Sequence, residues 1–243
     1  MIPFLQETRG AKTLDLTVVP WALIGTIISF VMRVGVIRVI TISEKEELER
    51  HGKLIERLFP GIETVSACIQ DQPRGVYDRE TERLAAEKVI RLASEMEGDV
   101  DAIFVSCAAD PGVEELKGKL SVPVVGAGEC LASLARALGQ KVGVLTIAEG
   151  VPEPIRRDLR GFLWEKVEGA ESTLDLRSRL DSVLQAAKAL LKKGCDVIAL
   201  ACTGFSTIGA APLIRRETGV PALDPVVAAG SVLYNLLCGE RRW

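Results

Sequence analysis

Two cysteines follow similar apolar runs in two parts of the chain, and their type and spacing could carry chemistry. Cys107 ends the run 101–107 (DAIFVSC), and Cys202 ends the run 196–202 (DVIALAC). Two thiols on opposite sides of a carbon could act as base and acid: a thiolate removes the proton from one face, and the other thiol returns a proton to the opposite face. Such a pair would racemise a carbon acid without a cofactor, because the reverse reaction only exchanges the two roles.

A structural interpretation of the same cysteines stays open. Cysteine is among the residue types most often found buried, and a disulfide would require the two Cα atoms to lie within about 7 Å. Equivalent positions in a repeated pattern favour function over packing. We expect the other four cysteines, which fall in strand or helix patterns, to be structural: Cys68, Cys130, Cys195 and Cys238.

Small and turn-forming residues follow both cysteines. Asp110 precedes Pro111, which predicts a helix cap with proline at the first helical position, and Ser206 or Thr207 could cap a helix in the second part. A thiol near the start of a helix feels oriented N–H groups and the positive end of the helix dipole. We therefore expect a lowered thiol pKa at both positions.

The strand and helix patterns that must position these thiols occur twice in the sequence. From residue 33 onward, short β-branched runs alternate with amphipathic helical patterns, which is typical of a parallel sheet with crossover helices. Similar elements in the same order indicate two related units. The repeated segments are 34–37 with 142–145, 101–107 with 196–202, and 122–125 with 220–223.

This repetition predicts an α/β fold of two pseudo-symmetric parallel-sheet halves, residues 33–138 and 141–235, with the active site in the cleft between them. Ligands of open parallel sheets gather at the carboxyl ends of the strands. Cys107 and Cys202 fall at two such ends.

Residues 1–31 form an apolar N-terminal extension. The 17-residue run Leu16–Met32 is uncharged, but it is short for a membrane span and contains Pro20 and Gly25. No small-residue cleavage site follows it, so a secretory signal is not indicated. A dispensable extension is the favoured interpretation, with a packed element or an anchor as alternatives.

Composition excludes several classes of function. Thirty Lys and Arg against 33 Asp and Glu give a net charge of −3, and 5% of residues are aromatic, which argues against a nucleic-acid surface. The single histidine, His51, makes Ser-His-Asp and multi-His metal chemistry hard to build, and its charged neighbours predict exposure. Residues 126–128 lack the dinucleotide fingerprint. We expect no metal, no cofactor, and reduced thiols in a cytoplasmic protein.

Four segments carry a family resemblance. The stretches 106–112 (SCAADPG), 123–129 (PVVGAGE), 201–204 (ACTG) and 220–225 (VPALDP) resemble the hydantoin racemases of the aspartate/glutamate racemase superfamily, and the resemblance covers most of residues 33–238. It implies cofactor-independent racemisation of 5-monosubstituted hydantoins, with Cys107 and Cys202 as the two catalytic cysteines. It also implies a small-molecule, hydantoin-like substrate and a homo-oligomer.

A hydantoin would need polar partners for its carbonyl and N–H groups. Donors near the cysteines could stabilise the charge that develops as the C5 proton leaves, in the manner of an oxyanion hole. The residues expected to bind substrate are Ser43, Ala108, Ala109, Thr146, Thr203 and Gly204.

The chain also departs from the superfamily's patterns. Residues 41–44 read TISE, where hydantoin racemases often carry an Asn-Pro-Asn-Thr segment. The amino-acid racemases' Cys-Asn-Thr, Cys-Thr-His and early Asp-Ser motifs have no match, and few Arg or Lys lie near the strand ends, which favours a neutral ring. Two alternatives stay open: amino-acid racemisation, or isomerisation or decarboxylation of a small diacid, and a two-lobed small-molecule binding protein whose cysteines only pack.

Overall fold

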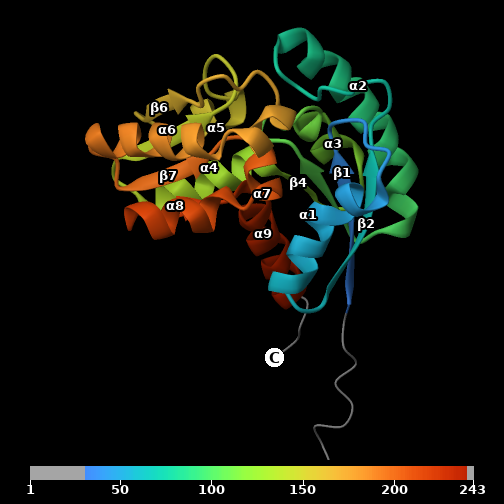
Figure 1. Cartoon of the computed structure of the whole chain (residues 1–243). Coiled ribbons are helices and arrows are strands. Elements are labelled where there is room, and N and C mark those ends of the chain that lie inside the picture. Colours follow the sequence, from blue (N-terminus) through green and yellow to red (C-terminus); the bar gives the residue numbers. More distant parts are fainter. Residues whose placement is uncertain (1–30, 240–243) are drawn as a thin grey trace, which may run out of the picture. The chain divides into compact units, whose positions relative to one another are not determined.

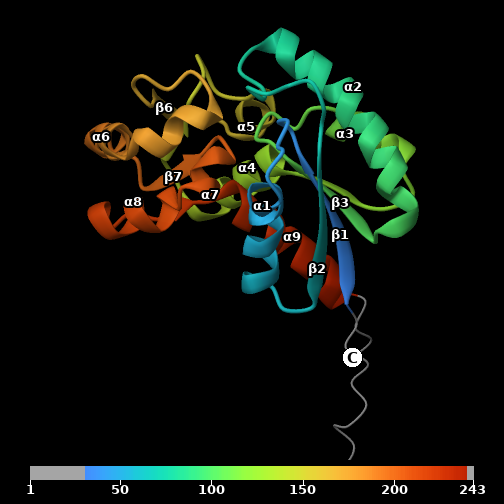
Figure 2. The same cartoon turned by 45° about the vertical axis from the view of Figure 1, so that its right-hand side comes forward.

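The computed structural model describes residues 31–239. They form two four-stranded parallel sheets with the same relative strand order, β2-β1-β3-β4 and β6-β5-β7-β8 (Figures 1 and 2). The predicted α/β fold of two pseudo-symmetric parallel-sheet halves is confirmed. The apolar extension expected at 1–31 lies outside the described residues except for Val31.

The strands and helices alternate along the chain. The strands are β1 (Met32–Arg38), β2 (Ile62–Cys68), β3 (Ala102–Ser106), β4 (Val124–Gly126), β5 (Val142–Thr146), β6 (Leu163–Lys166), β7 (Val197–Leu200) and β8 (Ala222–Leu223). The α-helices are α1 (Lys45–Leu58), α2 (Arg79–Met96), α3 (Val113–Lys119), α4 (Ala127–Leu138), α5 (Glu153–Asp158), α6 (Leu180–Lys192), α7 (Gly204–Thr207), α8 (Ala210–Thr218) and α9 (Pro225–Gly239), with 3₁₀ turns at Glu97–Asp99 and Thr173–Ser178.

Helix α2 shows why its sequence forms a helix where it does. Asp78 caps it by accepting a hydrogen bond from the Thr81 backbone N–H at 2.8 Å, and the Thr81 hydroxyl lies within hydrogen-bond distance of the Asp78 backbone. Ala85, Val89 and Ala93 recur at intervals of four and are buried, so one apolar stripe faces the sheet. Among residues 31–239, no helix is both long and apolar enough to cross a bilayer.

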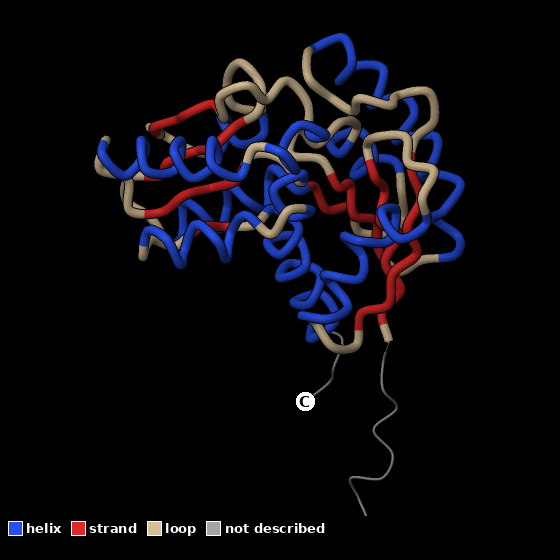
Figure 3. Tube along the Cα trace, viewed as in Figure 1, coloured by secondary structure: helices blue, strands red, loops and turns tan. Residues whose placement is uncertain are grey.

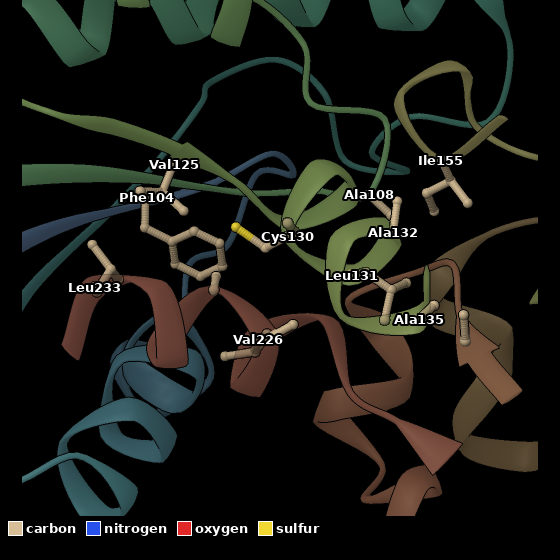
Figure 4. Packing of buried hydrophobic residues seen from close by; sticks show 14 of the residues in the cluster. Phe104, Ala108, Val125, Cys130, Leu131, Ala132, Ala135, Ile155, Val226 and Leu233 are labelled. Atoms are coloured by element: carbon tan, nitrogen blue, oxygen red, sulfur yellow. The ribbon is translucent and has the colours of Figure 1, made fainter. Parts of the chain in front are cut away.

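Helices α4 and α9 join the two halves. Helix α4, which follows β4, packs against β7 of the other sheet, and α9, which follows β8, packs against β3 and β4. Figure 4 shows Leu131 of α4 and Val226 of α9 in one apolar cluster with Phe104 of β3. In Figure 3 the strands lie in two groups on either side of these central helices. The halves therefore share a core, which fixes one sheet relative to the other.

Candidate active site

Both cysteines lie at the carboxyl ends of equivalent strands. Cys107 directly follows β3, and Cys202 lies two residues beyond β7, which occupies the same place in the second sheet. Both line one cavity of about 790 Å³, to which β1 contributes Arg38 and β5 contributes Thr146. The sheet repeat thus brings together two thiols that are 95 residues apart in the chain.

The two cysteine loops have the same backbone geometry. Each cysteine N–H donates to the carbonyl two residues earlier, at 3.0 Å for Cys107 and 2.9 Å for Cys202. Each cysteine carbonyl accepts from the N–H three residues later, at 3.0 Å and 3.1 Å. In each loop the N–H two residues later, of Ala109 and of Gly204, also hydrogen-bonds the thiol. The loops are therefore local repeats, with the sulfur held in the same way.

The loops contact each other across the halves. The Thr203 hydroxyl donates to the backbone carbonyl of Ser106 at 3.2 Å. The charge of the Cys202 thiolate also raises the pKa of Cys107, as expected for thiols in one site. All the described cysteines are free thiols, so the disulfide alternative between Cys107 and Cys202 does not occur in this structure.

Burial controls the acidity of both thiols. It raises the pKa of Cys107 and of Cys202 above the ordinary value, and the N–H groups of Ala109 and Gly204 offset only part of that effect. The expectation of a lowered thiol pKa is therefore wrong in its net direction, because the loss of hydration outweighs the oriented N–H groups. The free protein favours the neutral thiols.

The surroundings of the two thiols differ. The carboxylates of Asp110 and Glu82 further raise the pKa of Cys107. Cys202 has, besides the Gly204 N–H at 3.4 Å, which corresponds to Ala109 at Cys107, a hydrogen bond from the Thr173 hydroxyl that also stabilises its thiolate. Thr173 was not expected from the sequence. It lies in a 3₁₀ turn that is distant in the sequence from β3 and β7, the strands that precede the two cysteines, and no spacing pattern links it to Cys202.

Asp110 does not cap the helix that follows it. Gly112, with φ of +76°, takes the N-cap position of α3, and Asp110 itself adopts a φ of +50°. Its carboxylate accepts hydrogen bonds from the N–H groups of Gly128 and Glu129, both at 2.7 Å, at the start of α4. Burial raises the pKa of Asp110 to about 8. Asp110 thus joins the Cys107 loop to the central helix.

The second half makes the corresponding connection through two residues. Ser206 donates to the Asp224 carboxylate at 2.7 Å, and Asp224 accepts from the N–H groups of Val226 and Val227 at the start of α9. Asp224 therefore caps the start of α9. Ser206 and Thr207 lie inside α7 and cap no helix, because the N-cap residues of α7 and α8 are Thr203 and Gly209. Each cysteine loop is therefore bonded to the N-terminus of the helix that crosses to the other sheet.

The residues expected to bind substrate separate into two groups. Ala108, Ala109, Thr146 and Thr203 line the cavity with the cysteines. Gly204 is buried beside it and donates to Cys202. Ser43 is exposed and lines a different, smaller cavity of about 300 Å³, so the structure does not bring it to the thiols.

His51 is buried, not exposed. Its side chain lies between the cysteine loops with 1% of its surface accessible, Nδ1 at 2.8 Å from the Ser106 hydroxyl and Nε2 at 2.9 Å from the Thr207 hydroxyl. The charged neighbours of His51 in the sequence occupy other faces of α1, whereas Gly52 and Ile55 are buried with it.

The cavity carries more cations than the sequence suggested. Arg38 at the end of β1 is buried, and its Nη1 donates to the carbonyls of Glu47 and Leu48 at 2.6 and 3.3 Å. Desolvation lowers the pKa of Arg38 to about 10. Arg83 is paired with acids of its own helix, and Arg156 with Glu153. Among the described side chains, those of residues 31–236, no group of three or more His, Cys, Asp and Glu could hold a metal ion.

Comparison with known proteins shows the family to which the chain is similar. The family model described as Asp/Glu/Hydantoin racemase matches residues 56–232. The chain is 30% identical over 162 residues, 59% of its length, to the hydantoin racemase of Paenarthrobacter aurescens, and 27% identical over 142 residues, 54% of its length, to that of Pseudomonas sp. (strain NS671). These matches span 64% and 56% of those proteins, less than two thirds of their lengths.

Solved structures show the same fold. The allantoin racemase of Pseudomonas fluorescens superposes with a TM-score of 0.74 at 27% identity, covering 85% of this chain and 91% of that one. The maleate isomerase Iso of Pseudomonas putida S16 superposes with a TM-score of 0.66 at 18% identity, covering 86% and 93%. The second likeness concerns the fold alone.

Proposed function

The chain belongs to the Asp/Glu/hydantoin racemase family, and from that membership we propose that it racemises 5-monosubstituted hydantoins without a cofactor, with Cys107 and Cys202 as the two proton-transfer groups. One observation carries the proposal. Both thiols follow equivalent strands and line the same cavity from different halves of the fold.

The proposed reaction needs one thiolate and one thiol. The thiolate removes the C5 proton, and the electron pair left on carbon delocalises into the adjacent ring carbonyl. The opposite thiol then gives its proton to the other face of C5, which inverts the centre and leaves a thiolate on the second cysteine. The N–H groups of Ala109 and Gly204 already bond the two sulfurs, so the backbone N–H groups of Ala108 and Thr203 are the proposed donors for the carbonyl oxygen.

The unequal surroundings assign the roles in the free protein. Cys202 accepts from the Thr173 hydroxyl in addition to a backbone N–H, whereas Cys107 has a backbone N–H donor and lies near the carboxylate of Glu82. We therefore assign the first thiolate to Cys202 and the first thiol to Cys107. The reverse reaction exchanges them.

The charges of the cavity favour a neutral ring over a diacid. A dicarboxylate substrate requires free cations, yet three of the four arginines that line the cavity are already bonded: Arg38 by two backbone carbonyls, and Arg83 and Arg156 by glutamates. The fourth is Arg79, whose charge acts on Glu82. The half-buried Glu82 adds negative charge at the cavity wall. A ureide ring, which is uncharged and rich in N–H donors, suits this lining better than glutamate or maleate.

A substrate panel tests the proposal. We expect the full chain to abolish the circular dichroism of L-5-benzylhydantoin faster than the spontaneous rate, while L-glutamate keeps its signal and maleate is not isomerised. Turnover of glutamate or maleate without hydantoin racemisation would replace the proposal with another activity of the family. Binding of the hydantoin without turnover would support the binding-protein alternative.

The cellular setting follows from the same chemistry. Proton transfer by two cysteines requires both to stay reduced, so we propose the cytoplasm as the compartment. Homo-oligomerisation, which the family resemblance implies, stays a prediction that light scattering on the purified chain can test.

A further inference from the structure

The sole imidazole of the chain lies between the two cysteine loops. His51 is the single histidine of the 243 residues, and it projects from α1 rather than from either loop. Its Nδ1 lies 2.8 Å from the hydroxyl of Ser106, the residue before Cys107. Its Nε2 lies 2.9 Å from the hydroxyl of Thr207, the last residue of α7. One ring therefore contacts both halves.

Together with the bonds described above, these contacts form a ring of hydrogen bonds that connects the two cysteine loops. Helix α7 begins at Gly204, whose N–H donates to the Cys202 sulfur at 3.4 Å. The hydroxyl of Thr203, just before it, donates to the Ser106 carbonyl at 3.2 Å. Ser106 is thus linked to the second half twice: directly, through its carbonyl and Thr203, and indirectly, through its hydroxyl and His51, which in turn bonds Thr207.

The ring is suited to join two hydroxyls. Burial, and secondarily the charges of Arg38 and Arg50, hold the pKa of His51 well below its usual value, so the ring is neutral. A neutral imidazole has one donor and one acceptor nitrogen, and each can pair with a hydroxyl that turns to suit. Both nitrogens are then satisfied in a site that excludes water.

His51 does not line either of the two cavities described above. It can therefore act on the reaction only through Ser106 and Thr207, which makes it a positioning residue. Proton transfer to opposite faces of one carbon tolerates little error in the separation of the two groups, because a displacement of about 1 Å can cost about 100-fold in rate.

We propose that His51 sets the spacing of the two thiols by bonding the strand end that carries Cys107 to the helix that holds Cys202. This inference rests on the proposed two-thiol reaction for its effect on rate. The spacing itself can be measured without any turnover.

The first experiment measures spacing with dibromobimane, in which each of two thiolates displaces one bromide. At alkaline pH we expect the full chain to form a Cys107–Cys202 bridge, identified by peptide mass spectrometry. His51→Leu, which keeps bulk but loses both hydrogen bonds, should lower the bridged fraction at least tenfold in favour of singly modified chains. Thr207→Val removes only the Nε2 partner and should lower it in the same direction.

The matched control is Ile55→Val, which removes one methyl group from another buried position of α1. It should bridge like the parent protein, with all variants checked for cooperative melting. If His51→Leu does not fold, Thr207→Val decides the question. A folded His51→Leu or Thr207→Val variant that bridges like the parent overturns the proposal.

The second experiment separates positioning from binding. In hydantoin racemisation, His51→Leu should lower kcat about 100-fold while KM stays within about threefold, and His51→Gln should recover part of the loss. Equal kcat values for His51→Leu and the parent would overturn the proposal. If the parent bridges its thiols but racemises no hydantoin, the proposed function fails, and the bridging result alone decides the role of His51.

Discussion

The hydroxyl of Thr203 donates to the backbone carbonyl of Ser106 at 3.2 Å, so the residue after one cysteine contacts the residue before the other. Ser106 ends β3, and Thr203 opens the turn after β7. The bond therefore joins the ends of equivalent strands in different sheets. The spacing of Cys107 and Cys202 depends on this direct contact as well as on the shared core behind it.

Removal of that hydroxyl should weaken catalysis more than folding. Thr203→Val keeps the shape of the side chain and loses one hydrogen bond, which contributes about 1 kcal/mol in typical cases. We expect kcat to fall about tenfold, measured by loss of circular dichroism from L-5-benzylhydantoin. Thr203→Ser keeps the hydroxyl and should retain most of the rate. A loss in Thr203→Ser that Thr203→Val does not show would mean that the methyl group, not the bond, matters.

The rate should rise with pH. Burial raises the pKa of both Cys107 and Cys202, so the thiolate that starts the reaction is the minor form at pH 7 and increases as pH rises toward the raised pKa. We expect kcat/KM to increase between pH 7 and 9. Glu82→Gln removes a negative charge that raises the pKa of Cys107, so the rise linked to Cys107 should move to lower pH. A flat profile from pH 6 to 9 would contradict this account.

The two thiols should differ in reactivity. Cys202 has hydrogen bonds from Gly204 and Thr173 that stabilise its thiolate, whereas Cys107 lies near two acids. We therefore expect iodoacetamide to label Cys202 faster than Cys107, with the sites separated by peptide mass spectrometry. Thr173→Val should slow labelling of Cys202. Faster labelling of Cys107 in the parent protein would reverse the assignment of acid and base.

Two glycines offer a matched test of the close contact between the Cys107 loop and the start of α4. A Cβ on Gly128 would lie 2.2 Å from the Ala108 carbonyl oxygen and 2.9 Å from the Asp110 carboxylate, whereas one on Gly118 of α3 meets nothing within 4 Å. Gly128→Ala should destabilise the protein by about 1–3 kcal/mol, because the loop must move away from α4. Gly118→Ala should stabilise it by about 0.5–1 kcal/mol.

Urea unfolding measures both changes in the free energy of unfolding, provided that the variants share the parent's dependence of that free energy on urea concentration. Gly128→Ala should also lose racemase activity, since the displaced backbone carries Cys107. A Gly128→Ala variant as stable and active as Gly118→Ala would show that the close approach of α4 to the loop is not required.

The architecture, and the placement of Cys107 and Cys202 in one site, could be predicted from the sequence. Repeated strand and helix patterns predict repeated sheets, and the carboxyl ends of equivalent strands meet wherever two such halves face each other. That reasoning places Cys107 and Cys202 in one cavity without any knowledge of the loops.

Residues that act through contacts distant in the sequence were not predictable in the same way. Asp110 bonds a helix 17 residues further along, because Gly112 takes the capping position that the Asp-Pro pair suggested. Thr173 reaches Cys202 through a turn with no pattern of its own. The raised thiol pKa depends on burial, which local sequence does not give.

His51 did leave a signal. It lies four residues before Ile55, on the buried face of α1, and Gly52 beside it marks a close approach, since a Cβ there would lie 2.3 Å from the Thr64 hydroxyl. The helical spacing of His51 and Ile55 predicts a shared face. The many charged residues next to His51 in the sequence led instead to the prediction that it is exposed.

Hydrogen exchange at C5 in heavy water tests the two-thiol claim most directly. Each enantiomer of 5-benzylhydantoin is incubated separately with the full chain, Cys107→Ala and Cys202→Ala, and deuterium incorporation and inversion are followed by NMR and circular dichroism, with spontaneous rates subtracted. We predict that both variants lose racemisation of both enantiomers, while each still exchanges the C5 hydrogen of one enantiomer, a different one for each variant. Racemisation by either variant at the rate of the parent protein would contradict the account.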